Sequence, residues 1–363
     1  MISPGSHLAR LPVYEPGRPI EEVARELGLD PARILKLASN ENPLGPSPKA
    51  VAALEKASSG VHFYPDGNGF LLREALAKKH GLARGQVVLA NGSNEIIEFL
   101  GHAFLAPGDE MVISQYAFAI YEIVARLFRA KVVEVPARAF GHDLDAMRAA
   151  ITPRTRLVFV ANPNNPTGTA VSAKALERFL RAMPESALAV VDEAYQEFLE
   201  RPLDTPRFLA RKPNVVVMRT FSKAQGLAGL RIGYGLAAPE VAVALQKVRQ
   251  PFNANLLAQT AALAALGDKT HLRRTIRTVR AGRRFLQDAF RERNLGHVPS
   301  CANFVLVRVG NGKKVFEALL RLGVIVRPMD GYRLPEWIRV TVGRPAENKI
   351  FLKALDQVLG RKG

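Results

Sequence analysis

A lysine, an aspartate and an asparagine each lie at or just beyond the end of an apolar stretch of this chain. Lys223 lies in "TFSKAQGLAGLRIGY" after "VVVM", Asp192 ends "ALAVVD", and Asn165 lies in "NPNNPTG" after "RLVFVA". A partly desolvated lysine near another cation has a lowered pKa and can become a nucleophile. A buried carboxylate costs free energy unless a cation or several donors face it. Taken alone, each residue is also compatible with a surface lysine, a helix N-cap or a rigid turn.

An anion site is indicated where "QVVLA" is followed by "NGSNEIIEFLGHAF". This segment predicts a strand, a Gly-Ser-Asn turn and a helix that begins near Ser93 and Asn94. Free N–H groups and the helix dipole at such a start attract phosphate, although an ordinary N-cap explains the same residues. Hydroxyl groups and a guanidinium also flank Lys223 in the chain: they belong to Thr220, Ser222 and Arg231.

The elements that carry these residues alternate in a regular order. Short apolar, β-branched runs are separated by amphipathic helical stretches, and the runs are 86–90, 110–113, 130–135, 156–161, 187–192, 215–218 and 230–237. This order predicts an α/β fold with a mostly parallel, seven-stranded sheet covered by helices on both faces. Because ligands of such sheets bind outside the carboxyl ends of the strands, the polar residues described above are expected to meet there.

The pattern changes near residues 247–259 and predicts a second, smaller unit. A long helical stretch is followed by three apolar runs, at 302–309, 323–329 and 337–343. We therefore expect an N-terminal arm that includes part of the small domain, a large domain and a small α+β domain, at 1–45, 46–255 and 256–363. The arm is rich in Pro and Gly and contains a short helix at 19–28.

The composition excludes several classes of function. The 363 residues carry 51 Lys and Arg against 33 Asp and Glu, a net charge of +18, and a single cysteine, Cys301. No stretch is apolar for the length of a membrane span, and one cysteine fits a reducing compartment, so we expect a cytoplasmic protein that does not bind a membrane. The seven histidines are scattered, which predicts no metal site. The basic residues follow helical faces, which favours a solvated surface over nucleic-acid binding.

Together, the strand ends supply the groups that pyridoxal phosphate requires. That cofactor needs a lysine for its aldehyde, a carboxylate for its ring nitrogen, and donors for its phenolate and phosphate. A nicotinamide site instead needs GxGxxG between a strand and a helix, and the nearest match, "GNG" at 67–69, follows no predicted strand. A phosphate-binding P-loop motif is absent from the sequence.

The same motifs resemble a known family. The order "NPNNPTG", "VVDEAY", "TFSKAQGLAGLRIGY", "WIRVTVG" is similar to that of the fold-type-I pyridoxal-phosphate aminotransferases. Within them, "YEPGRPIEEVARELG", "SNENPLGPSP", "YPDGNGFLLREAL", "SQYAFAIY" and "VRPMDGYRLPEWIRVTVG" resemble the histidinol-phosphate aminotransferases. The likeness extends over essentially the whole chain and implies a large domain with a small α+β domain.

The resemblance implies a role for each site residue. Lys223 is expected to bind the cofactor aldehyde and move a proton, Asp192 to pair with the ring nitrogen, and Asn165 and Tyr195 to bind the phenolate oxygen. The phosphate is expected to be held by Ser93, Asn94, Thr220, Ser222 and Arg231, with Tyr64 reaching in from a second subunit. Phe118 is favoured to stack on the ring, with Tyr116 as the alternative. The substrate is expected to contact Arg339, Arg327, Tyr14 and Asn42.

The reaction implied is the transfer of an amino group from histidinol phosphate to a 2-oxo acid, with 2-oxoglutarate expected, by a ping-pong sequence in a homodimer. Three alternatives stay open. An aromatic amino-acid aminotransferase uses the same arginine for a carboxylate, and a decarboxylase of a phosphorylated amino acid has the same fold. A non-catalytic, basic module that binds nucleic acid belongs to a different class and predicts salt-sensitive binding with no bound chromophore.

Overall fold

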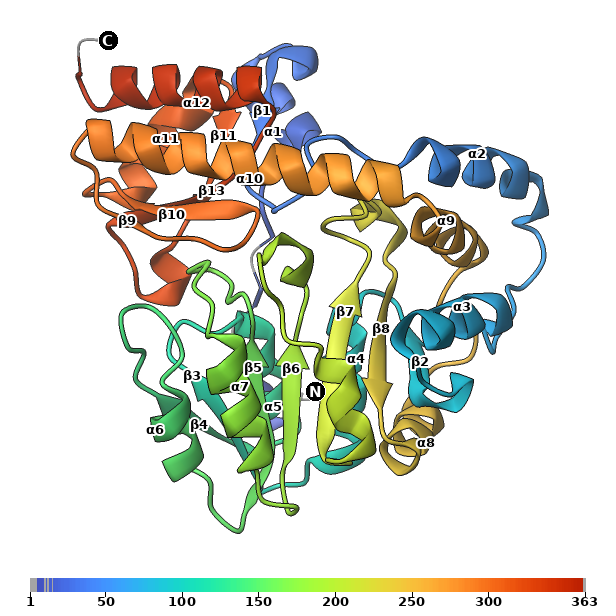
Figure 1. The fold of residues 1–363 in the computed structure, drawn as a ribbon. Helices are drawn as coiled ribbons and strands as arrows, with labels where there is room; N and C mark the ends of the chain where they lie inside the picture. The colour runs from blue at the N-terminus through green and yellow to red at the C-terminus, as the bar shows by residue number, and fades with distance from the viewer. Residues whose placement is uncertain (1–4, 10, 12, 15, 362–363) are drawn as a thin grey trace.

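A seven-stranded sheet lies at the centre of the larger part of the molecule (Figure 1). The computed structural model describes residues 5–361 apart from 10, 12 and 15. The strand order is β2-β8-β7-β6-β5-β3-β4. The strands are β2 (Val87–Ala90), β3 (Glu110–Ser114), β4 (Lys131–Val135), β5 (Thr155–Ala161), β6 (Leu188–Asp192), β7 (Val215–Thr220) and β8 (Gly233–Ala237). β8 runs antiparallel to both neighbours, whereas β7, β6, β5, β3 and β4 pair in parallel. The predicted mostly parallel α/β sheet is confirmed.

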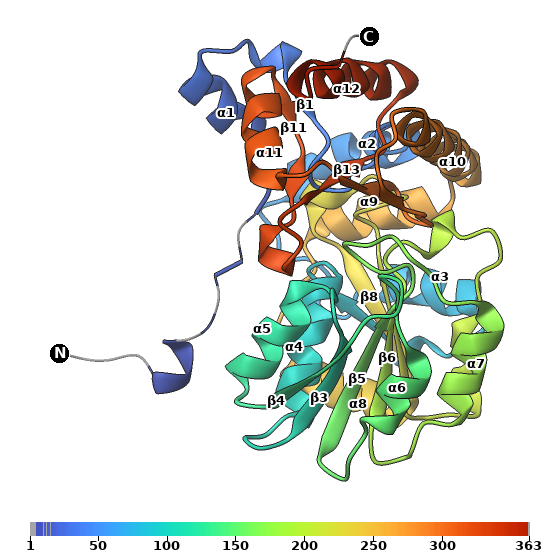
Figure 2. The same cartoon turned by 90° about the vertical axis from the view of Figure 1, so that its left-hand side faces the viewer.

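Helices cover both faces of this sheet (Figure 2). One face packs against α4 (Ser93–Phe104), α5 (Ala119–Leu127) and α8 (Pro239–Val248). The other packs against α2 (Pro48–Ala57), α3 (Phe70–His80), α6 (Leu144–Ala149), α7 (Ala173–Arg181) and α9 (Leu256–Leu266). Strand residues alternate between the two cores: Val190 and Met218 face the first set of helices, whereas Val191 and Val217 face the second. Both faces are therefore apolar, as near-continuous runs such as "LAVV" predict.

The smaller part of the molecule is built on an antiparallel sheet in the order β12-β13-β10-β9. Its strands are β9 (His297–Val298), β10 (Phe304–Arg308), β12 (Arg327–Pro328) and β13 (Trp337–Thr341), and its helices are α11 (Gly312–Arg321) and α12 (Pro345–Val358). The N-terminal segment joins it, because β1 (Leu35–Lys36), which follows α1 (Ile20–Leu27), pairs in parallel with β11 (Val324–Ile325). The division at 1–45, 46–255 and 256–363 stays a prediction, and parts of the arm lie outside the described residues.

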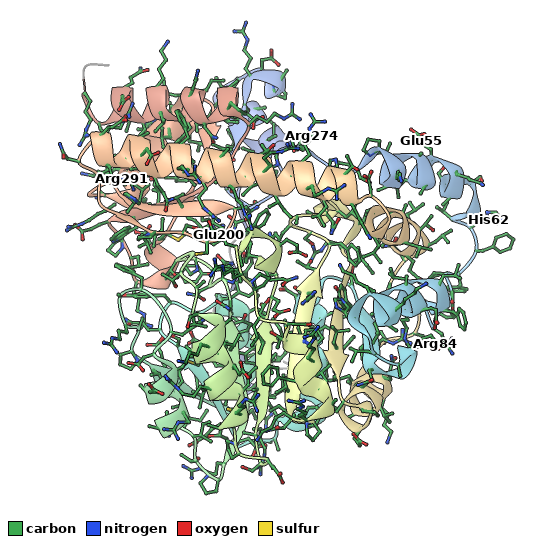
Figure 3. All side chains as sticks on the ribbon, viewed as in Figure 1. Glu55, His62, Arg84, Glu200, Arg274 and Arg291 are labelled. Carbon is green, nitrogen blue, oxygen red and sulfur yellow. The ribbon has the colours of Figure 1, made fainter. Side chains whose placement is uncertain are left out.

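The long helix α10 (Lys269–Glu292) runs across the upper part of the molecule in Figure 1, below α12. Its buried side contacts β10 and α12, and basic side chains on its outer side are exposed, including those of Arg273, Arg274, Arg277 and Arg284. Figure 3 shows Arg274 and Arg291 along this helix. No helix among residues 5–361, leaving out 10, 12 and 15, combines the length and apolar character that crossing a membrane requires.

Candidate active site

A cavity of about 320 Å³ lies where β5, β6 and β7 end and the small sheet approaches them. All the predicted site residues except two line it: Tyr14, Ser93, Asn94, Phe118, Asn165, Asp192, Tyr195, Thr220, Ser222, Lys223, Arg231, Arg327 and Arg339. They come from eight or more separate segments, yet the parallel strands bring most of them to one edge of the sheet. Past Tyr14 and Arg327 the cavity adjoins a wider hollow of about 680 Å³.

Lys223 lies in the loop after β7, with its amine directed into this cavity. The ammonium Nζ donates to the Ser39 carbonyl oxygen at 3.1 Å and lies 5.7 Å from the centre of the Tyr195 ring. Burial, together with the cations Arg339 and Arg231, lowers the pKa of Lys223 to about 8. Near neutral pH the lysine therefore has an appreciable neutral fraction, which a nucleophile or a base requires.

Asp192 ends β6 and is 7% exposed. Its Oδ1 accepts the Ala194 N–H at 3.0 Å, and its Oδ2 accepts the hydroxyl of Tyr121 at 2.6 Å. Burial raises the pKa of Asp192, and these two hydrogen bonds oppose the rise. Tyr121 was not among the residues predicted from the sequence. A signal was present, because a tyrosine on the apolar side of a helix needs a partner for its hydroxyl group.

Arg339, on β13, reaches across from the small sheet to the loop after β5. It donates to the Asn165 side-chain oxygen and, at 2.7 Å, to the Ala38 carbonyl oxygen, while its buried Nε has no hydrogen-bond partner. Asn40 adds a second link, because its Nδ2 donates to the Tyr195 hydroxyl at 2.9 Å. Asn165, Asn40 and Tyr195 thus form one side of the cavity, although Asn40 is more than a hundred residues from the other two in the chain.

The N-terminus of α4 meets Arg231 at the other end of the cavity. Gly92, at φ +77°, precedes this helix, and a Cβ there would lie 2.5 Å from the Arg231 Nη2. Arg231 Nη1 also donates to Ser222 Oγ at 3.4 Å, and the Ser222 N–H donates to Thr220 Oγ1 at 3.0 Å. A helix N-terminus, hydroxyl groups and a guanidinium together form a site suited to a phosphate.

Phe118 lines the cavity directly before α5, whereas Tyr116 does not. Phe118 packs edge-on against Tyr121, with ring centres 5.7 Å apart, while Tyr116 stacks on Phe140 at 5.8 Å. Of the two candidates for a stacking ring, the structure therefore places only Phe118 at the cavity.

Two predicted residues lie elsewhere. The Asn42 amide donates to the Ala224 carbonyl oxygen at 3.1 Å and to Thr275 Oγ1 at 3.2 Å, so it supports the loop of Lys223 from outside the cavity wall. Asn42 therefore does not line the cavity in the described structure, whereas Asn40 does. The role of Asn42 in substrate binding stays a prediction. Tyr64 is 81% exposed and stacks on Phe252 at 4.6 Å, so within one chain it does not line the cavity. Its service to a second subunit stays a prediction.

Comparisons with known proteins agree with this geometry. Residues 32–355 match the family model described as aminotransferase class I and II. The chain belongs to this family. It is 54% identical to the histidinol-phosphate aminotransferase of Akkermansia muciniphila, over 97% of the chain and 98% of that protein. It is 52% identical to histidinol-phosphate aminotransferase 2 of Ralstonia nicotianae, over 96% and 95%.

The fold agrees as well. A crystal structure of histidinol-phosphate aminotransferase from Sinorhizobium meliloti, in complex with pyridoxal 5′-phosphate, superposes with a TM-score of 0.89 at 29% identity and covers 98% of this chain and 97% of that one. The fold-type-I aminotransferase architecture and the family resemblance predicted from the motifs are confirmed, and the chain is an aminotransferase.

Proposed function

We propose that this chain transfers the amino group of L-histidinol phosphate to 2-oxoglutarate, giving imidazole acetol phosphate and L-glutamate, with pyridoxal 5′-phosphate as its cofactor. One observation carries the proposal: the cavity has a cation at each end and a reactive lysine between them. Arg231 and the start of α4 form one anion site, and Arg339 with Arg327 forms the other. The relatives named histidinol-phosphate aminotransferase support the choice of substrate.

The residues present fit pyridoxal phosphate. Gly92 leaves room for the Arg231 guanidinium against the start of α4, where the phosphate is expected. All of the residues expected to hold it, apart from Tyr64, line the same cavity. We expect Asp192 to pair with the ring nitrogen, Asn165 and Tyr195 with the phenolate, Phe118 with the ring face, and Ser93, Asn94, Thr220 and Ser222 with the phosphate. When bound, the cofactor would accept the electron pair that remains at the substrate Cα when the proton leaves.

The side chains of the chain itself supply proton transfer and binding. With a pKa lowered to about 8, Lys223 would accept the proton from the substrate Cα and deliver it to C4′ of the cofactor. Arg339, whose Nε has no hydrogen-bond partner in the described structure, binds the anionic end of the substrate. Arg327 lies 5.8 Å from the centre of the Tyr14 ring, and these two side chains close the same end of the cavity.

The test is a comparison of amino donors. We expect kcat/KM for histidinol phosphate to exceed that for phenylalanine and aspartate by about tenfold or more. The reason is that a pair of arginines binds a phosphate group more strongly than it binds a single carboxylate or an aromatic ring. A preference for an aromatic amino acid would refute this substrate and favour the aromatic aminotransferase, while carbon dioxide release would favour the decarboxylase.

The cofactor is tested by colour. The purified protein should absorb visible light through bound pyridoxal phosphate, and Lys223→Ala should lose that absorbance and the activity. Lys247→Ala, which changes an exposed lysine on α8, is the matched control and should retain both. A colourless wild-type protein that binds DNA or RNA in a salt-sensitive manner would instead support the nucleic-acid-binding alternative.

A homodimer with shared sites is part of this proposal. Tyr64 is exposed, as are its chain neighbours Val61 and Phe63 and the Phe252 ring on which it stacks, and Figure 3 shows the nearby His62 at the edge of the molecule. Exposed apolar patches mark interaction sites. Mixing inactive Lys223→Ala with inactive Tyr64→Ala chains should restore part of the activity. If subunit exchange is verified and no activity returns, a shared site is refuted.

A cytoplasmic location is also part of the proposal, and the cysteine content supports it.

A further inference from the structure

The hydroxyl group of Tyr121 has no role among the residues assigned to the reaction so far. Tyr121 is fully buried on α5, three residues after Phe118, and its N–H donates to the Phe118 carbonyl oxygen at 3.1 Å. A buried phenol is costly unless its hydroxyl group finds a partner. Its partner here is the one carboxylate that faces the cavity from the end of β6.

The contact with Asp192 is short and involves a charge. The Tyr121 hydroxyl donates to Asp192 Oδ2 at 2.6 Å, within the range of a hydrogen bond between a phenol and an ionised carboxylate. Burial and the carboxylate raise the pKa of Tyr121 well above its ordinary range, so the phenol keeps its proton and acts as a donor. The other carboxylate oxygen accepts the Ala194 N–H, and two donors thus fix the plane of the Asp192 side chain.

The ring of Tyr121 has a second contact of equal interest. It stacks on Phe159 of β5 at 4.3 Å with an interplanar angle of 21°, and it meets Phe118 edge-on at 86°. Phe159 is itself buried, so the tyrosine ring has a fixed position between the sheet and the start of α5. One side chain therefore contacts both the carboxylate and the aromatic ring that are expected to hold the cofactor.

We propose that Tyr121 is a positioning residue of the cofactor site, whose hydroxyl group orients the Asp192 carboxylate and keeps it ionised and whose ring supports Phe118. This inference rests on the proposed function. Without the hydroxyl group, the Ala194 N–H would be the one donor of the two that still bonds to Asp192. Burial would then favour the protonated form of Asp192, which pairs poorly with a protonated ring nitrogen.

The experiment compares Tyr121→Phe with Tyr234→Phe. Both variants lose one buried phenolic hydroxyl group, but that of Tyr234 bonds to His80 on the other face of the sheet. For Tyr121→Phe we expect the dissociation constant of pyridoxal phosphate from the apoprotein to rise about tenfold, as for a hydrogen bond to a charged group. The pH midpoint of the absorbance of the bound cofactor should shift by about half a unit or more, and kcat should fall with little change in KM. Tyr234→Phe should alter none of these quantities.

A double-mutant cycle identifies the route of the effect. If the hydroxyl group acts through Asp192, Tyr121→Phe should weaken cofactor binding little further in an Asp192→Asn background. The inference is overturned if Tyr121→Phe leaves both the dissociation constant within twofold and the pH midpoint unchanged, or if the effects of the two substitutions simply add. A wild-type protein that fails to bind pyridoxal phosphate refutes the proposed function and this inference together, whereas a normal wild type with an unaltered Tyr121→Phe refutes the inference alone.

Discussion

Two groups of charged side chains lie near the ends of β6 and β7, on opposite faces of the same sheet. On the cavity face are Asp192 and Lys223, with Arg339 reaching in from β13. On the other face, Glu193 and Arg219 form an ion pair at 2.7 Å, with side chains 4% and 8% exposed. Asp192 and Glu193 are neighbours in the chain, and the alternation of a strand sends them to opposite faces.

The group on the far face is complete by itself. Arg219 bonds to Glu193 Oε2, and Thr205 Oγ1 donates to Glu193 Oε1 at 2.6 Å. Burial lowers the pKa of Arg219, but Glu193, Tyr234 and Glu197 together more than offset this and raise it overall. Nearby, burial and Arg219 lower the pKa of His80 to about 3, so this histidine stays neutral beside the Tyr234 hydroxyl. Glu193 and Arg219 thus each have a charged partner, which is the requirement for stability in a core.

The group on the cavity face is incomplete by the same standard. Within the described structure, Lys223, Arg231 and Arg339 bond to carbonyl, hydroxyl and amide oxygens rather than to carboxylates. Burial therefore lowers the pKa values of Lys223 and Arg339, and the acidic groups nearby offset this only in part. We infer from this comparison that the ion pair on the far face stabilises the fold. The cations on the cavity face are instead available to bind anionic ligands.

The largest contrast between the faces is expected from Asp192→Asn. Loss of the charge opposite the cofactor ring should lower kcat/KM by about 10³-fold, because an electrostatic group in a dry site is worth that much. The stability of the apoprotein should change little or increase, because the isosteric amide removes a buried charge whose pKa burial raises. Steady-state kinetics and urea unfolding of the apoprotein measure the two effects, and a strong loss of stability would contradict the assignment of Asp192 to ligand binding.

The opposite result is expected from Arg219→Met. Removing one partner leaves Glu193 buried and unpaired, which should lower the free energy of unfolding by about 3–5 kcal/mol. Arg181→Met is the matched control, since it breaks a surface pair with Glu177 and should cost less than about 1 kcal/mol. Glu193→Gln combined with Arg219→Met should recover much of the loss. If Arg219→Met unfolds at the wild-type urea concentration, the pair does not stabilise the fold.

The fold was predictable because buried parallel strands are continuous apolar runs. All seven runs proposed for the large sheet form strands. The antiparallel direction of β8 was not predictable, because hydrophobicity records burial and not chain direction. The β1–β11 pair was missed because each strand has two residues, too few to show a period.

The site was predictable to the extent that its residues follow strands. Lys223 and Asp192 are examples, since the carboxyl ends of neighbouring strands meet in space. Asn40 was missed because tertiary contacts hold it in place: it has φ +56°, and its N–H donates to Thr341 Oγ1, 301 residues away. Neither feature leaves a local pattern, so "ENP" pointed to Asn42 instead.

A moderate gain in stability is expected from Lys223→Met in the apoprotein. The folded-state pKa of about 8 lies below the ordinary value of 10.5, so the unfolded chain binds the additional proton between these pH values. The charge of Lys223 should therefore lower the free energy of unfolding of the wild type by its full amount below about pH 8. This loss should disappear as the pH rises toward 10.5. We expect the variant to be more stable by about 2 kcal/mol at pH 7, with a smaller difference at pH 10. Urea unfolding at both pH values measures this, and an equal gain at both would exclude the titration of Lys223 as its cause.

The smallest effect is expected from Thr205→Val on the far face. Thr205 is fully buried, and the substitution keeps its shape while removing one of the donors to Glu193. The ion pair with Arg219 remains, so the free energy of unfolding should fall by only about 1 kcal/mol. The cofactor absorbance and its pH midpoint should not move, because the sheet separates Thr205 from the cavity. Urea unfolding measures the first effect and an absorbance titration the second. A shifted pH midpoint would mean that the two groups of charges are coupled through Asp192 and Glu193. The separate roles assigned to the two faces, stability on one and ligand binding on the other, would then be wrong.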